Sequence, residues 1–69
     1  MKYTIGTRFI RNGDKHKRIY TIIDYYITTN HAGEVVKSRY VAGYEMLGQI
    51  LIDPDITQTT IDKATIVQQ

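Results

Sequence analysis

Apolar and polar positions alternate cleanly from Val35 to Leu47, and alternation with a period of two predicts a β-strand with one buried face. The face expected to be buried carries Val36, Ser38, Tyr40, Ala42, Tyr44 and Met46. An earlier stretch, Lys17 to Thr28, is rich in β-branched and aromatic residues, which favour strands. Asn30 to Gly33 separates the two stretches and contains turn-forming residues. We therefore expect a long antiparallel hairpin.

The charged residues suggest a register for this hairpin. With a four-residue turn, Asp24 faces Arg39 and Arg18 faces Glu45, so that opposite charges meet across the strands. The other face then stacks apolar residues, namely Ile27 on Val36, Ile23 on Tyr40 and Ile19 on Tyr44. A shift by one residue would break both ion pairs and mix the two faces.

The remaining pattern predicts shorter elements. Lys17 to Thr28 is long for one strand, so we expect a bend or bulge that lets Ile22 and Ile23 both find apolar partners. The other expected elements are a first strand at Thr7 to Arg11, a turn at Asn12 to Asp14, a turn at Leu47 to Gln49, a fourth strand at Ile50 to Asp53 that ends at Pro54, a helical turn at Pro54 to Gln58 with Asp53 as its N-cap, and a last strand at Thr59 to Ile66.

This order of elements predicts the fold class. Five strands, one long bent hairpin and a helical turn before the last strand indicate an all-β protein, and the arrangement resembles the small five-stranded Src-homology-3-like barrels, a group of shapes that includes Tudor and KOW modules. We expect residues 1–69 to form a single domain.

Composition narrows the chemistry. The 69-residue chain has no cysteine, so neither a disulfide nor a thiolate metal site can staple it, and a small unstapled domain often gains stability from a partner. No apolar run is long enough to cross a membrane. We expect a cytoplasmic protein with no membrane partner, and homo-oligomerisation is an open possibility.

Few residues suit catalysis or metal binding. Ser38 is the only serine, and His16 and His31 both fall in predicted turns, so no nucleophile–base–orienter set is indicated. Asp53 and Asp55 lack the spacing and the glycine of a calcium loop. We therefore expect no enzymatic activity, no cofactor and no metal site.

The net charge of +2 hides an asymmetry along the chain. Residues 1–18 hold six Lys or Arg against one Asp, giving 6 − 1 = +5, and residues 19–69 hold three against six, giving 3 − 6 = −3. The basic residues surround the first predicted turn, and we expect them to bind phosphates or carboxylates, with Tyr20 and Tyr26 adding rings for stacking or contact. The candidate binding residues are Arg8, Arg11, Lys15, Lys17, Arg18, Tyr20 and Tyr26. A charged loop that only keeps the domain in solution explains the same pattern.

Assembly offers a second interpretation. The basic and acidic ends are complementary, so copies of the chain could bury one end against the other. In the expected register Tyr20, Ile22 and Val41 lie opposite the main apolar stack. They form either an exposed interface patch or, if the sheet curves strongly, part of the core.

A resemblance covers most of the chain. Gly6 to Phe9, Tyr20 to Asp24, Gly33 to Lys37, Arg39 to Ala42 and Thr59 to Ile61 are similar to small proteins encoded by bacteriophages. Related chains end in Ala-Arg-Gly, where this one has Asp62-Lys63-Ala64. The resemblance implies a phage accessory protein that acts in the host cytoplasm by binding a host factor, nucleic acid or a signalling molecule.

The expected function is therefore that of a non-enzymatic binding protein whose basic first hairpin meets nucleic acid or an acidic host protein. The alternative is an oligomeric anti-defence protein that captures a small anionic or nucleotide ligand, or blocks a host defence complex, at a subunit interface.

Overall fold

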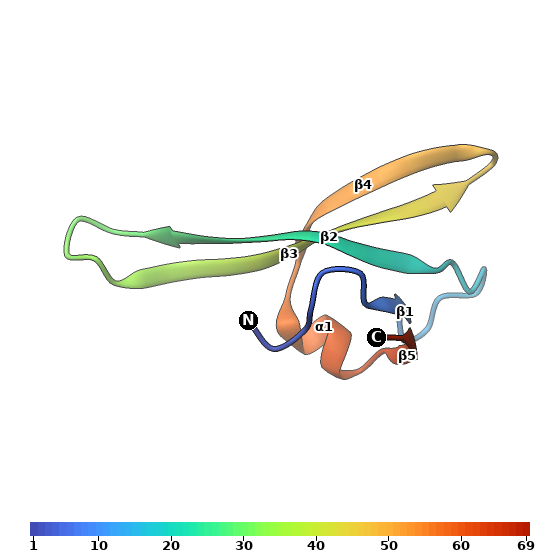
Figure 1. Cartoon of the computed structure of the whole chain (residues 1–69), viewed down its shortest axis with the longest axis horizontal. Coiled ribbons are helices and arrows are strands. Elements are labelled where there is room, and N and C mark those ends of the chain that lie inside the picture. The colour runs from blue at the N-terminus through green and yellow to red at the C-terminus, as the bar shows by residue number, and fades with distance from the viewer.

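The chain forms one five-stranded antiparallel sheet with a single short helix. The computed structural model describes residues 1–69, and its elements are β1 (Arg8–Ile10), β2 (Tyr20–Thr29), β3 (Val35–Met46), β4 (Gln49–Ile56), α1 (Gln58–Asp62) and β5 (Thr65–Gln68). The strand order is β4-β3-β2-β1-β5 (Figure 1). The expected β-rich fold is confirmed. Because β4 and β5 are two free edges, the sheet does not close on itself.

The core is small and lies where the middle of the sheet meets α1. It consists of seven buried apolar residues drawn from β1, β2, β3, the end of β4 and α1, namely Phe9, Tyr20, Ile22, Tyr40, Ala42, Ile56 and Ile61. The segment before β1 runs along the same side of the sheet as α1 (Figure 1). Only 8 of the 69 residues are buried, so the core covers a short central part of the long strands.

The register expected from the charges is wrong. Tyr20 pairs with Tyr44 and Ile22 with Ala42, and because the register shifts after Ile22, Asp24 faces Val41 and not Arg39. Burying an aromatic or aliphatic side chain gains about 1.5–3 kcal/mol, whereas an exposed ion pair gains about 0–1 kcal/mol, so the apolar residues decide the register. The two arginines find other partners: Arg39 pairs with Asp55 at 2.9 Å and Arg18 with Asp14 at 3.1 Å.

The expected bulge in β2 is present. The pairing of β2 with β3 shifts between Ile22 and Asp24, which leaves Ile23 as the extra residue. Ile22 is fully buried, but Ile23 is 47% exposed, so only one of the two isoleucines reaches the core. The side chains of Tyr20 and Ile22 are buried, so these two residues belong to the core and not to an exposed patch.

The end of the chain departs from the expected boundaries. Strand β4 continues through Pro54 to Ile56, which is possible because β4 is an edge strand and a proline there need not break a ladder on both sides. The helix is capped by Thr57, whose Oγ1 accepts from the backbone N–H of Thr60 at 3.2 Å, and Asp53 caps no helix. Because the helix occupies Gln58–Asp62, β5 begins only at Thr65.

Two hairpins extend beyond the core in opposite directions (Figure 1). The β2–β3 hairpin ends at the turn around Asn30, whose side-chain Oδ1 accepts from the N–H groups of Ala32 and Glu34. The β3–β4 hairpin ends at Leu47 and Gly48, both of which have positive φ. These arms give the molecule extents of 43 × 23 × 20 Å.

The hydroxyl of Tyr40 gives the first prediction. The backbone N–H groups of Lys2 and Tyr3 donate to Tyr40 Oη at 2.9 and 3.0 Å, and the Tyr40 side chain is buried. Tyr40→Phe leaves both donors without their partner, and we expect the free energy of unfolding to fall by about 1–3 kcal/mol.

Tyr25→Phe is the matched control, because Tyr25 Oη makes no hydrogen bond although its ring packs 4.7 Å from that of Tyr40. Urea unfolding should show a loss for Tyr40→Phe only. Equal losses in the two variants would contradict the anchoring role of this hydroxyl.

Candidate binding surface

The basic residues gather on the segment that joins β1 to β2. We call residues Arg11–Ile19 the basic loop. Two backbone hydrogen bonds fold it into successive turns, from Asp14 N–H to the Arg11 carbonyl and from Lys17 N–H to the Asp14 carbonyl, each at 3.2 Å. Gly13 adopts a φ of 82°, which the absence of a Cβ permits. The loop lies at the end of the molecule opposite the Asn30 turn (Figure 1).

Asp14 organises the basic loop. Its carboxylate accepts from the backbone N–H groups of His16 and Arg18 and from Nε and Nη2 of the Arg18 guanidinium, at 3.0–3.2 Å. Only 4% of the Asp14 side chain is exposed. The hydrogen bond from Arg18 holds the pKa of Asp14 below its ordinary value, and the same contact raises the pKa of Arg18. Arg18 is thus engaged within the loop and does not pair with Glu45.

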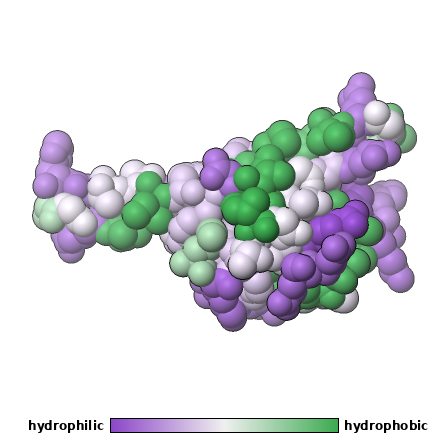
Figure 2. Space-filling view, viewed as in Figure 1, coloured by the Kyte–Doolittle hydropathy of each residue, from purple (hydrophilic) through white to green (hydrophobic).

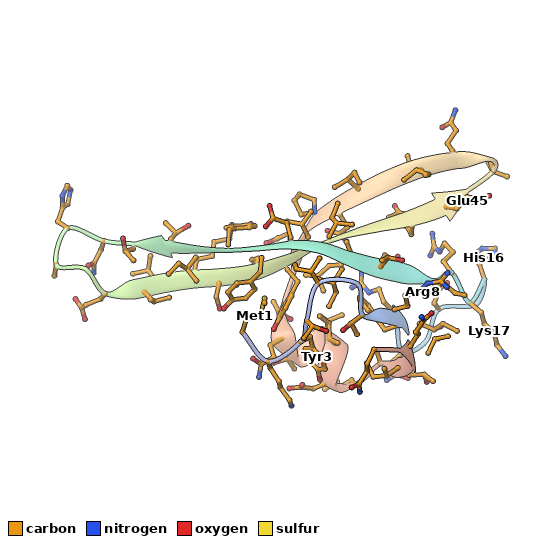
Figure 3. The ribbon with its side chains drawn as sticks, in the orientation of Figure 1. Met1, Tyr3, Arg8, His16, Lys17 and Glu45 are labelled. Atoms are coloured by element: carbon orange, nitrogen blue, oxygen red, sulfur yellow. The ribbon has the colours of Figure 1, made fainter.

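The other cations fall into two groups. Arg11 is paired, with Nη1 3.4 Å from Asp53 Oδ2, although the sequence left it without a partner. Lys15 and Lys17 are exposed and form no ion pair, and Arg8, half-buried on β1, also forms none. Figure 3 shows Arg8, His16 and Lys17 at the same end of the molecule. The structure therefore brings the five predicted basic residues to one end but leaves three of them free.

The two predicted tyrosines do not join this group. Tyr20 is 4% exposed and packs between Phe9 and Tyr44, with ring centroids 5.4 and 4.7 Å away. Tyr26 lies on the β2–β3 arm, where its hydroxyl donates to the Pro54 carbonyl at 2.9 Å and Lys37 sits over its ring. The shifted register explains both positions, because it places Tyr20 in the core and Tyr26 beside Arg39.

The structure also has a groove on the sheet that was not predicted from the sequence. The side of the sheet that faces away from the core, which we call the outer face, holds a groove of about 300 Å³. Its lining residues come from β1, β2, β3 and β4 and the segments next to them, namely Arg8, Ile19, Thr21, Ile23, Gly43, Tyr44, Glu45 and Ile50. Hydrophobic side chains gather along this part of β4 (Figure 2). The apolar run Ile50 to Ile52 could have indicated this surface. An edge strand cannot bury both of its faces in so small a core, so one of the apolar faces must be exposed.

Two acidic residues predict how stability depends on pH. Hydrogen bonds from Lys2 and Tyr3 hold the pKa of Asp62 below its ordinary value, as Arg18 does for Asp14. A lowered folded-state pKa adds stability that is complete above the unfolded-state pKa of about 3.9 and is lost as pH falls through the folded-state value. We expect the urea concentration at the unfolding midpoint to decrease when the pH is lowered below about 4. In Asp14→Asn this decrease should be smaller.

Asp24→Asn is the control for this experiment, since the Asp24 carboxylate is exposed and forms no ion pair. Its pH dependence should match that of the wild type. If Asp14→Asn retained the full wild-type dependence, Asp14 would not be the ionised centre of the loop.

No helix in the structure is long and apolar enough to span a membrane. Comparison with protein-family models, with curated protein sequences and with solved structures gave no significant match.

Proposed function

We propose that this chain is a non-enzymatic binding protein whose basic loop engages an acidic surface on another protein. One observation carries the proposal: Lys15 and Lys17 are exposed on a loop that Asp14 holds in place, and neither ammonium group has a carboxylate partner within the chain.

The internal pairing separates structural cations from available ones. Asp14 neutralises Arg18 and Asp53 neutralises Arg11, so these arginines brace the loop at its two ends. The unpaired cations Lys15 and Lys17, on either side of His16, then form a short exposed apex. Exposed charges such as those of the apex attract a partner of opposite charge and set its orientation as it binds.

A protein partner fits this apex better than nucleic acid. Binding to a single strand commonly uses exposed aromatic rings as stacking platforms, but the Tyr20 ring is buried and the Tyr26 hydroxyl is bonded to β4. Duplex binding depends strongly on phosphates neutralised by Lys and Arg, and the loop has only two unpaired cations, Lys15 and Lys17. A few lysines at a defined spacing suit an acidic protein surface.

The small-ligand alternative has weaker support. Arg8 lines the outer-face groove and could meet an anion, but the Glu45 carboxylate lines the same groove and opposes one. The strand order β4-β3-β2-β1-β5, with α1 between β4 and β5, supports the proposed likeness to Src-homology-3-like barrels, which host many binding functions. The phage origin stays a prediction.

The test compares two double charge reversals. Lys15→Glu with Lys17→Glu removes the apex, and Lys37→Glu with Lys63→Glu makes the same change in net charge elsewhere. A labelled peptide of alternating glutamate and alanine and a labelled 20-base-pair DNA duplex serve as probes in anisotropy titrations at several salt concentrations. We expect the peptide to bind, to weaken as salt rises, and to lose about tenfold or more in affinity in the apex variant only.

Three results would overturn this proposal. Tighter binding of the duplex that depends on Lys15 and Lys17 would identify nucleic acid as the partner class. Binding of neither probe, or equal losses in both double variants, would show that the apex is not a specific binding surface.

A further inference from the structure

The outer face of the sheet has no layer over it. Helix α1 and the segment that precedes β1 both pack against the opposite side of the sheet, where the core lies. Ile50 is 75% and Ile52 is 54% exposed, and Ile19 and Ile23 beside them are also exposed. Several exposed isoleucines on one face of so small a protein indicate an interaction site.

The charged residues that line the groove indicate which charges a partner must carry. Its only charged lining residues are Arg8 and Glu45, and neither forms an ion pair within the chain. One free cation and one free anion give the groove no net charge, so neither an acidic nor a basic partner would match both. A second copy of the same face, rotated by a two-fold axis, matches both at once because such an interface is self-complementary.

Gly43 supplies an independent observation. A Cβ at this position would meet Ile52 Cδ1 at 3.6 Å and Ile50 Cγ2 at 3.9 Å, which are ordinary contacts, and the Gly43 φ is not positive. Nothing within the chain therefore requires glycine in the middle of β3, where it weakens a strand. A glycine inside a strand marks a bulge, a bend or a close approach by another backbone, and the strand pairings show no bulge at Gly43.

We propose that the outer faces of two copies pack against each other about a two-fold axis, with Arg8 of each copy opposite Glu45 of the other. Arg8 pairs with Thr21, Thr21 with Gly43 and Gly43 with Ile52, so these four residues form one row across the sheet. Glu45 lies in the next row of this face, beside Ile50.

The spacing of these rows is compatible with the two-fold. We take an idealised flat sheet, with strands about 4.8 Å apart and a rise of about 3.4 Å per residue. With Ile23 placed one row beyond Thr21, the rotation that sets Arg8 over the second copy's Glu45 also sets Ile23 over Ile52 and brings Thr21 close to Gly43. The missing side chain at Gly43 leaves room for Thr21. One operation thus satisfies the two charges, two exposed isoleucines and the strand glycine.

Charge reversal tests the pairing directly. We expect the wild type to sediment as a dimer at micromolar concentration, and R8E or E45R alone to weaken the dimer by about tenfold or more, because like charges then meet across the axis. An equimolar mixture of R8E and E45R should associate again, because one chain carries two carboxylates at the contact and the other two guanidinium groups. An effect confined to one chain cannot produce this rescue.

A matched pair locates the interface. Ile23→Glu places a charge on the outer face, and Ile27→Glu places one on the β2–β3 arm at a residue of similar exposure. Ile23→Glu should give folded monomers by circular dichroism and sedimentation, and Ile27→Glu should remain dimeric. The Lys15→Glu, Lys17→Glu variant should also remain dimeric, so that failure of the acidic-partner proposal is distinguishable from failure of this one.

Three outcomes would overturn the proposal. If the wild type were still monomeric at about 100 µM, well above the micromolar concentration at which we expect a dimer, the dimer would be excluded. Dissociation by Ile27→Glu but not by Ile23→Glu would move the contact to the arm. Failure of the R8E and E45R mixture to associate would exclude the Arg8–Glu45 contact.

Discussion

The bulge at Ile23 decides which side chains of β2 enter the core. In a regular strand Tyr20, Ile22 and Asp24 would share one face, and the Asp24 carboxylate would enter the core, where an unpaired charge is costly. The extra residue moves Asp24 to the surface and brings Tyr25 to the core side, where its ring packs on Tyr40. Both halves of the hairpin can then present apolar residues to Phe9, Ile56 and Ile61.

The same bulge determines which residues are left outside. Because Tyr20 and Ile22 face the core, Ile19 and Ile23 lie on the outer face with Ile50. The charged residues follow this choice. Arg39 reaches Asp55 on β4 and Arg18 closes a local contact with Asp14, so the ion pairs adapt to the register and do not create it. Among the residues of the two candidate surfaces, Arg8, Lys15, Lys17 and Glu45 form no ion pair.

The two surfaces are built on different principles. The basic loop is ordered by short-range contacts, since Asp14 binds His16 and Arg18 within four residues of itself. Its Asp14–Arg18 pair could have been found from the sequence as a local contact after the Asn12-Gly13 turn, but the assumed register assigned Arg18 to Glu45. The outer face needs four strands in the correct alignment, and no local pattern describes it. Tyr20 was predicted to lie at the binding surface and not in the core, because its position also depends on the alignment of several strands.

The amino-acid pattern was enough to predict the β-rich class, the turns near Asn12, Asn30 and Gly48, the presence of a bulge in β2, and the burial of Tyr40 and Ala42 on β3. These features depend on residue alternation and turn chemistry, which act over a few neighbouring residues. The register of β2 on β3, the passage of β4 through Pro54 and the position of α1 follow from contacts between distant parts of the chain. A slip of one residue changes little locally but moves every side chain to the opposite face, and Phe9, Ile56 and Ile61, distant in sequence, decide which face is covered.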